Sequence, residues 1–271
     1  MTTETRDDGP RLSDADLASV MALIKDADTV ELKVTVPAEA HRATIQGLPM
    51  DPVEAQPRQV FFFDTPELTL YDAGLVVRAR RVQGGRGDTV IKLRPVVPTE
   101  LPPALRREVG FGVEVDVLPG GYVCSASLKG RSTGEEIRDV VRGKGPLRRI
   151  FSKEQRALYR QHAPDGIELD SLVPLGPTFV LKARFPIDSS FSAGAEPRLL
   201  VAELWLYPDG SRILELSTKC APREAFQVGM ETRAYLVARG IRISTVQQPK
   251  TKTALAFYAA QLREEPVGAA S

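Results

Sequence analysis

The chain has 271 residues, of which 42% are hydrophobic and 26% are charged, as expected for a soluble globular protein with a sizeable core. Its 36 Lys and Arg residues nearly balance its 35 Asp and Glu residues, which argues against a nucleic-acid binder with a global positive field but not against a local basic pocket. No apolar run is long enough to span a bilayer, and the polar, acidic N-terminus is unlike a signal peptide, so we expect a cytoplasmic protein that does not bind membranes. The two distant cysteines, Cys124 and Cys220, are expected to be reduced thiols.

The first part of the chain predicts a helix followed by several strands. Residues 1–12 have the composition of a disordered tail, and Ser13 is placed to cap a helix in which apolar residues recur at helical spacing. A proline near its first turn and a final glycine predict a short helix at 65–74. Strands are predicted at 29–37, 59–64, 74–82 and 89–95, with irregular or briefly helical structure at 38–57.

The second part of the chain adds strands and ends in two helices. Residues 107–116 alternate in the manner of a strand, and residues 133–142 predict a helix followed by a loop. Further strands are predicted at 150–159, 167–173, 178–185, 199–207 and 211–219, and helices at 221–239 and 253–263. The elements between residues 13 and 263 predict a single α+β domain dominated by antiparallel strands, and a loose tail is expected at 264–271.

Charged residues alternate with aliphatic residues in two successive predicted strands. Arg78 and Arg80 share one face of the first strand, and Lys92 and Arg94 share one face of the second, because a β-strand sends successive side chains to opposite faces. If these faces meet inside a closed sheet, they form a basic channel that requires an anion. The alternative is a solvated outer face with ordinary salt bridges.

The other reactive residue types favour phosphate binding and oxygen-ligated metals. His41 and His162 are too few and too isolated for a zinc site or a histidine-based triad. The chain contains neither the phosphate-binding loop motif nor the glycine-rich motif of dinucleotide-binding folds. Glutamates in strand-like contexts together could supply oxygen ligands to Mg²⁺ or Mn²⁺, although each one singly is also typical of an exposed strand: Glu31, Glu108, Glu203 and Glu215.

The stretch from Phe61 to Arg80, FFFDTPELTLYDAGLVVRAR, resembles the central motif of CYTH-domain proteins. These triphosphate tunnel metalloenzymes include thiamine triphosphatases, inorganic triphosphatases and class IV adenylyl cyclases. Pieces similar to the family follow in order, so that the resemblance covers residues 28–258: Ile91–Arg94, Arg106–Glu108, Lys153–Arg156, Glu203, Glu215 and Lys252. The resemblance implies an eight-stranded antiparallel tunnel-like barrel that holds a triphosphate between basic side chains and a glutamate-bound metal.

The resemblance is weaker for the acidic residues than for the basic ones. Where the family has Glu-x-Glu-x-Lys, this chain has Thr29-Val-Glu31-Leu-Lys33, and where the family has three alternating acids, the segment 213–217 keeps only Glu215. A site with fewer carboxylates holds Mg²⁺ more weakly, because ligand charge largely retains a hard divalent ion. We therefore expect anion binding to be preserved and metal-assisted hydrolysis to be weakened.

The resemblance also implies roles for individual residues. Lys33 would neutralise charge on the leaving oxygen, and Glu203 would act in catalysis. One Mg²⁺ or Mn²⁺ would be held by Glu31, Glu108, Glu203 and Glu215. The phosphates would be clamped by Arg78, Arg80, Lys92, Arg94, Lys153, Arg156 and Lys252. The resulting prediction is a metal-dependent triphosphatase whose partner is a small triphosphate or polyphosphate; a non-catalytic phosphate-binding module, an adenylyl cyclase, a scaffold with surface charges and a homodimer stay open as alternatives.

Overall fold

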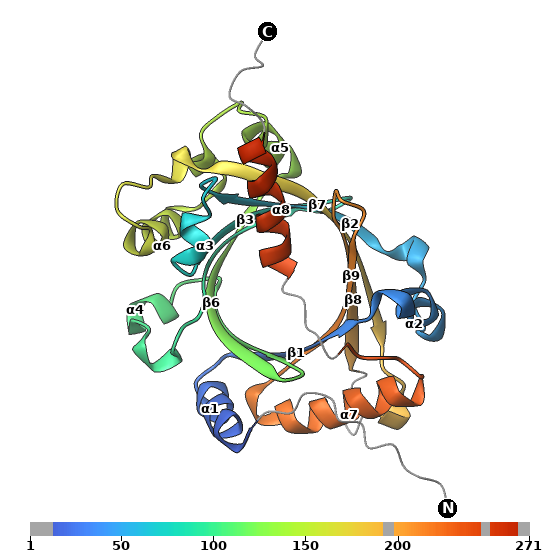
Figure 1. Cartoon of the computed structure of the whole chain (residues 1–271). Coiled ribbons are helices and arrows are strands. Elements are labelled where there is room, and N and C mark those ends of the chain that lie inside the picture. The colour runs from blue at the N-terminus through green and yellow to red at the C-terminus, as the bar shows by residue number, and fades with distance from the viewer. Residues whose placement is uncertain (1–12, 192–197, 245–249, 265–271) are drawn as a thin grey trace, which may run out of the picture.

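A closed β-barrel with helices around its outer wall forms the described part of the computed structural model, which comprises residues 13–191, 198–244 and 250–264 (Figure 1). The strand order is β1-β5-β6-β4-β3-β2-β7-β8-β9, and β9 pairs with β1 to close the ring. β1 and β5 run parallel, and the other neighbouring strands are antiparallel. The strands are β1 (Thr29–Val36), β2 (Gln56–Asp64), β3 (Leu75–Val82), β4 (Gly87–Leu93), β5 (Phe111–Leu118), β6 (Gly121–Ser132), β7 (Val173–Pro186), β8 (Leu199–Leu206) and β9 (Arg212–Cys220).

Helices occupy the connections between the strands and both flanks of the described chain. The α-helices are α1 (Asp14–Lys25), α2 (His41–Gly47), α3 (Thr69–Asp72), α4 (Pro103–Arg106), α5 (Gly134–Val141), α6 (Lys153–His162), α7 (Ala225–Ala238) and α8 (Lys250–Glu264). Short 3-10 helices lie at Ala38–Ala40, Pro52–Glu54, Pro98–Glu100, Leu147–Ile150, Leu169–Ser171, Ser189–Phe191 and Pro222–Glu224. None of the helices in the described ranges combines the length and apolar character that a membrane span needs.

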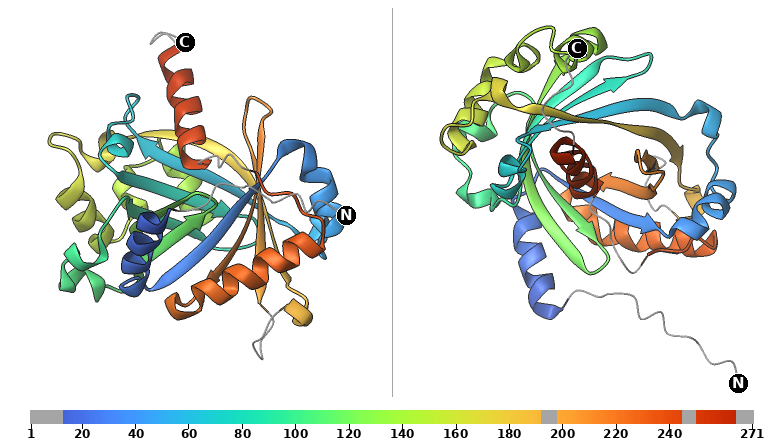
Figure 2. Two further views of the ribbon diagram at one scale, coloured as in Figure 1. Left: turned by 60° about the horizontal axis from the view of Figure 1, so that its bottom comes forward. Right: turned by 45° about the horizontal axis from the view of Figure 1, so that its top comes forward.

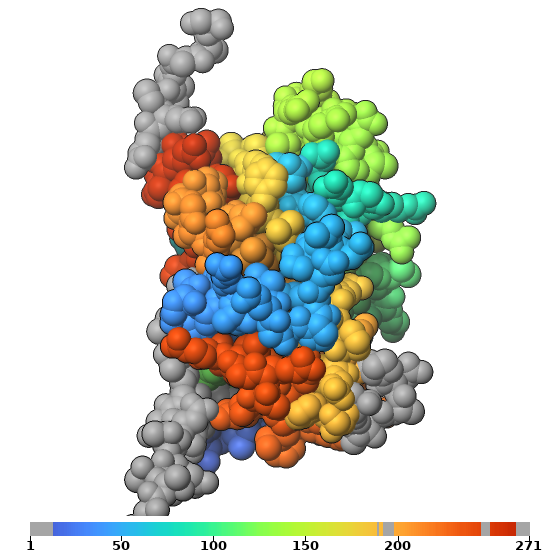
Figure 3. All heavy atoms as spheres, turned by 90° about the vertical axis from the view of Figure 1, so that its right-hand side faces the viewer, coloured from blue at the N-terminus to red at the C-terminus, as the bar shows by residue number. Residues whose placement is uncertain are grey.

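The barrel wall has an apolar outer face, and its inner face carries charged side chains together with an apolar patch on which α8 packs. On β3, Val77 and Ala79 are buried in a hydrophobic core that residues of α1, α5 and α6 complete from outside. The side chains that alternate with them, Arg78 and Arg80, therefore point into the ring. Helices α1, α5, α6 and α7 lie outside the ring, whereas α8 stands at one of its open ends (Figure 1 and Figure 2). Figure 3 shows the side on which the blue segment carrying α2 covers the wall next to the orange turn between β8 and β9.

The predicted α+β class and the barrel are confirmed, with nine strands in place of eight. The predicted cap of the first helix is also present, because Ser13 Oγ accepts a hydrogen bond from Asp16 N at 3.1 Å. Cys124 and Cys220 are free, as predicted, and both are buried. The two predicted tails lie outside the described residues, except for Glu264 at the end of α8.

Two predicted strands, at 150–159 and 167–173, are wrong. The first region forms α6, and the second contains a 3-10 helix before β7 begins. The reason for α6 is local: Gln155 N donates to Ser152 Oγ at 3.2 Å, and Ser152 N donates to Gln155 Oε1 at 3.1 Å, which is a capping box. Strand β6, in contrast, is absent from the predicted set.

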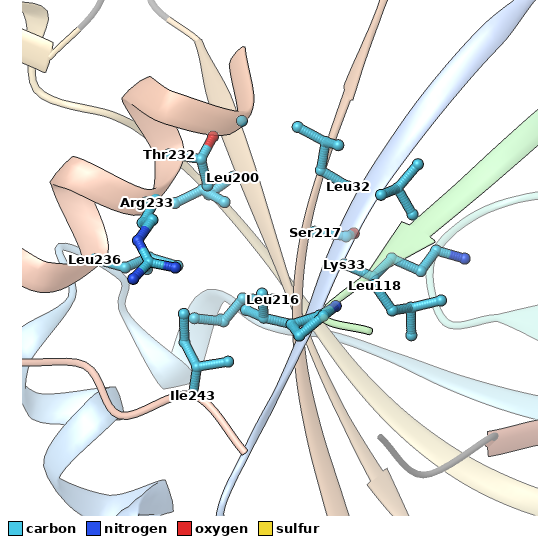
Figure 4. A pocket seen from close by; sticks show the side chains of 14 residues that line it. Leu32, Lys33, Leu118, Leu200, Leu216, Ser217, Thr232, Arg233, Leu236 and Ile243 are labelled. Atoms are coloured by element: carbon cyan, nitrogen blue, oxygen red, sulfur yellow. The ribbon is translucent and has the colours of Figure 1, made fainter. Parts of the chain in front are cut away.

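A cavity of about 290 Å³ lies between α7 and the outer face of the barrel wall (Figure 4). Aliphatic side chains from both sides line it, among them Leu32, Leu200 and Leu236. Lys33 also borders this cavity, but its side chain points away from α7 (Figure 4) and contacts the carboxylates of Glu31 and Asp116. The cavity is therefore separate from the charged interior.

Gly229 lies within α7 at the edge of this cavity and offers a test of its packing. The nearest atom that a methyl group there would meet outside the helix is Leu32 Cδ1, at 3.7 Å, which is an ordinary contact. Because glycine inside a helix costs roughly 0.5–1 kcal/mol relative to alanine, we expect Gly229→Ala to raise the free energy of unfolding by about that amount in urea denaturation.

The contrasting variant is Gly130→Ala, in β6. Its methyl group would lie 2.8 Å from Thr89 Oγ1 and would collide with the Gln155 side chain, so this variant is expected to lose stability. A Gly229→Ala protein no more stable than the wild type would show that the cavity wall is not as open as the structure indicates.

Candidate functional site

The predicted arginines of β3 face the interior and share one acid on β4. Arg80 Nε donates to Asp88 Oδ2 at 2.8 Å, and Arg78 Nη2 lies 3.7 Å from Asp88 Oδ1. Arg78 Nε is buried and has no hydrogen-bond partner among the described residues. Burial and the neighbouring Arg80 lower the pKa of Arg78 to about 10, and Asp88 offsets them only in part. Arg78 therefore presents a guanidinium group whose charge is incompletely neutralised.

A second group of cations converges on Asp116 of β5, whose side chain is only 1% exposed. Lys33 Nζ of β1 lies 2.9 Å from Asp116 Oδ1, while Arg94 Nη2 and Lys92 Nζ lie 3.6 Å and 4.0 Å from Asp116 Oδ2. Because β6 separates β4 from β5 in the wall, Lys92 and Asp116 meet across the concave inner face. Although burial acts in the opposite direction, Lys33 and Lys92 hold the pKa of Asp116 below its usual value. The basic pairs predicted from the sequence therefore do face a shared interior.

Lys92 gives the site a pH dependence. Burial lowers its pKa to about 8, although Asp116 opposes this shift. Anion binding uses the protonated ammonium group, so we expect the affinity for tripolyphosphate to be highest below pH 8 and to fall as the pH rises through 8. Calorimetric titrations with tripolyphosphate at several pH values between about 6.5 and 9.5, a range that brackets the pKa of Lys92, would measure this decline. The Lys92→Arg variant is the matched control, because arginine stays charged and should remove the decline that Lys92 causes; identical pH profiles would contradict the expectation.

Carboxylates gather where β1 and β5 pair. Oxygens of Glu31, Glu114 and Asp116 lie within 4.8 Å of one another. Lys33 Nζ is 3.0 Å and Lys219 Nζ is 3.6 Å from Glu31 Oε2, and Lys219 also contacts Glu114. Although burial acts in the opposite direction, Lys33 and Lys219 lower the pKa of Glu31 to about 2. Oxygen ligands of this kind suit a hard divalent cation, and the Lys219 side chain is 48% exposed and can move aside, so this acidic cluster could hold a metal ion in place of Lys219.

A second acidic group lies on β8 and β9, where Glu203 and Glu215 are direct cross-strand partners. Lys182 Nζ lies 3.2 Å from Glu203 Oε1, while Lys250 Nζ lies 3.1 Å from Glu203 Oε2 and 2.5 Å from Glu215 Oε1. Although burial acts in the opposite direction, Lys250 and Lys182 lower the pKa of Glu203. Both carboxylates already hold an ammonium group, so a metal ion does not fit this pair while Lys250 occupies it.

Four residues of the predicted site are not brought into the interior. Glu108 is exposed in the turn that precedes β5, so it is not placed with the other predicted metal ligands. Lys153 and Arg156 lie on α6, outside the barrel, where Arg156 donates to backbone oxygens of nearby residues. Lys252 is exposed on α8, and Lys250, one half-turn earlier, takes the inward position instead.

Sequence reasoning missed other charged residues that contribute to the interior network: Arg58, Asp88, Glu114, Asp116, Lys182, Lys219 and Lys250. A signal for two of them was present, because Glu114 and Asp116 alternate inside the predicted strand 107–116. Arg58 directly precedes the predicted start of its strand, and Lys182 alternates with neighbours in the predicted strand 178–185. These two lacked the paired spacing that made Arg78 and Arg80 stand out.

Solved structures of other proteins share this fold. A candidate adenylyl cyclase from Hippeastrum, described as having a dominant triphosphatase activity, is 16% identical and has a TM-score of 0.60, with 84% of this chain and 95% of that chain covered. A candidate adenylate cyclase from Bacillus halodurans is 13% identical and has a TM-score of 0.55, with 83% and 98% covered. No family model and no curated protein matches the chain. The chain therefore has the barrel fold of these two proteins, as the CYTH resemblance predicted.

Proposed function

We propose that the barrel interior binds the phosphates of a triphosphate-containing small molecule and that the protein hydrolyses this molecule with the help of a divalent metal ion. The observation that carries the proposal is the unmet positive charge of the interior, above all the buried Nε of Arg78, which has no partner among the described residues. Asp88 pairs with both Arg78 and Arg80. Asp116 likewise pairs with Lys33, Lys92 and Arg94. Grouped cations in a half-buried space repel one another, and an anion relieves that repulsion.

Each inner group has a distinct part in this proposal. Arg78 and Arg80 would each grip two phosphate oxygens, because a guanidinium group presents its donors as a fork. Lys33 would stabilise charge that develops on the leaving oxygen. The acidic cluster of Glu31, Glu114 and Asp116 would hold Mg²⁺ or Mn²⁺, whose chemistry is to polarise a phosphoryl oxygen.

The triphosphatase activity described for the Hippeastrum protein supports a triphosphate as the substrate class. Phosphate release from tripolyphosphate, ATP and thiamine triphosphate, each with Mg²⁺ or Mn²⁺, tests the proposal. We expect release from at least one of them, and we expect Glu31→Gln, in the acidic cluster, to lower turnover while binding persists. Tight binding without release would favour the non-catalytic module, and cyclic AMP formed from ATP would favour the cyclase. Neither binding nor release would contradict the proposal.

A further inference from the structure

Lys250, the first residue of α8, lies inside the end of the barrel. Its Nζ contacts both Glu203 and Glu215, at 3.1 Å and 2.5 Å, and lies 5.0 Å from the centroid of the Trp205 ring. Its backbone oxygen accepts a hydrogen bond from the Tyr207 hydroxyl at 3.2 Å. The side chain is 14% exposed, so the ammonium group is largely withdrawn from water.

The rest of α8 anchors Lys250 in this position. Ala254, Leu255 and Tyr258 are buried in a hydrophobic cluster that includes side chains of β2, β7 and β8. The Tyr258 hydroxyl also donates to Pro177 O at 2.5 Å. Burial of this kind stabilises the docked helix, and the hydrogen bond fixes the middle of the helix against β7. The packed helix therefore places the Lys250 ammonium group next to Glu203 and Glu215, whereas Lys252 on the same helix is exposed.

The same carboxylate oxygens would serve either a lysine or a metal ion. Glu203 and Glu215 face each other across neighbouring strands, and two like charges in a buried position need a cation between them. Lys250 supplies that cation and reaches both acids, while Lys182 reaches only Glu203. Although burial acts in the opposite direction, Glu215 and Glu203 raise the pKa of Lys250, so its ammonium group stays charged at neutral pH.

We infer that Lys250 takes the place of a divalent cation between Glu203 and Glu215, so that this part of the barrel contributes to phosphate binding without a metal ion. This inference rests on the proposed function, because it specifies how the same interior holds its anion. As a consequence, the two acidic groups of the interior differ in the cation that they hold. Glu31, Glu114 and Asp116 are the cluster left to bind a metal ion, while the charge at Glu203 and Glu215 comes from the chain itself.

Titration of tripolyphosphate into the full chain, first with EDTA and then with Mg²⁺, tests this inference. We expect the wild type to bind in EDTA and Lys250→Met to bind at least roughly tenfold more weakly, because a charge-assisted contact is lost and two buried acids are left unpaired. Mg²⁺ should then strengthen binding by the variant more than binding by the wild type, because the freed carboxylates can accept it. Lys252→Met is the matched control and should behave as the wild type.

If Lys250→Met and Lys252→Met give the same affinities with and without Mg²⁺ while the wild type binds, the inference is overturned and the proposed function stands. If the wild type binds no tripolyphosphate under either condition, both the inference and the proposed function are overturned.

A second measurement, on the wild type, tests the inference even if the Lys250→Met variant does not fold. Trp205 is the only tryptophan of the chain and donates to Glu203 Oε2 at 3.3 Å, so its fluorescence reports on this pair. We expect Mg²⁺ to leave the fluorescence of Trp205 unchanged. A saturable change in this fluorescence that EDTA reverses would overturn the inference.

Discussion

Arg78→Ala is expected to weaken tripolyphosphate binding by about 10- to 150-fold, measured by calorimetric titration in EDTA at low salt. The expectation follows from the unpaired, buried Nε of Arg78 and from its long contact with Asp88, at 3.7 Å. Hydrogen bonds to charged groups contribute about 1.5–3 kcal/mol each, and tenfold in affinity corresponds to about 1.4 kcal/mol. The interior would thus lose a donor that no protein group among the described residues already uses.

The matched control for this variant is Arg81, three residues further along β3. Its side chain lies on the opposite face of β3, where Nε donates to Gly134 O at 2.8 Å and another donor contacts Gln59. Arg81→Ala removes the same formal charge from the same strand, so long-range electrostatics change similarly in the two variants. We expect Arg81→Ala to change the affinity less than threefold (a shift below about 0.7 kcal/mol). Equal losses in both variants would show that tripolyphosphate senses only net charge.

Asp116→Asn is expected to lower the free energy of unfolding by about 3 kcal/mol at pH 7, measured by urea denaturation. Asp116 is buried beneath Lys33, Lys92 and Arg94, and an amide in its place leaves these cations without their shared counter-charge. Glu135→Gln is the control, because Glu135 forms an exposed ion pair with Arg138 and pairs of that kind contribute at most about 1 kcal/mol.

The destabilisation by Asp116→Asn should depend on pH in a defined direction. The pKa of Asp116 is lowered in the folded protein, so its carboxylate contributes stability above its usual value, about 4 for an aspartate. That contribution is lost as the pH falls through the lowered value. The difference between wild type and variant should therefore be full at pH 7 and should shrink below about pH 4. A difference that is constant over this range would assign the effect to packing instead of charge.

Period-two spacing of charge predicted the most important part of the site correctly. Arg78 and Arg80 alternate with Val77 and Ala79, whose burial against the outer helices leaves the arginines only the inner face. The same reasoning failed at Lys153, where the capping box between Ser152 and Gln155 starts a helix and overrides the apparent alternation. Short-range capping is a stronger signal here than a brief run of alternating residues.

The parts that the sequence did not predict depend on weak hydrophobic signals or on distant contacts. On β6, the outward residues Cys124, Ala126 and Leu128 are buried, but two of them are small and give a faint alternation. The choice between Lys250 and Lys252 could not be made from spacing alone. It is decided by which face of α8 packs on the barrel, and Leu255 and Tyr258 settle this only in the folded protein.

The most direct test of the charged interior is the titration of tripolyphosphate into the wild-type chain with EDTA, at two salt concentrations. The cations gathered around Asp88 and Asp116 predict saturable binding of one tripolyphosphate per chain, weaker at the higher salt concentration because ions screen the attraction. Absence of saturable binding at the lower salt concentration would contradict the account of this barrel as a phosphate-binding site.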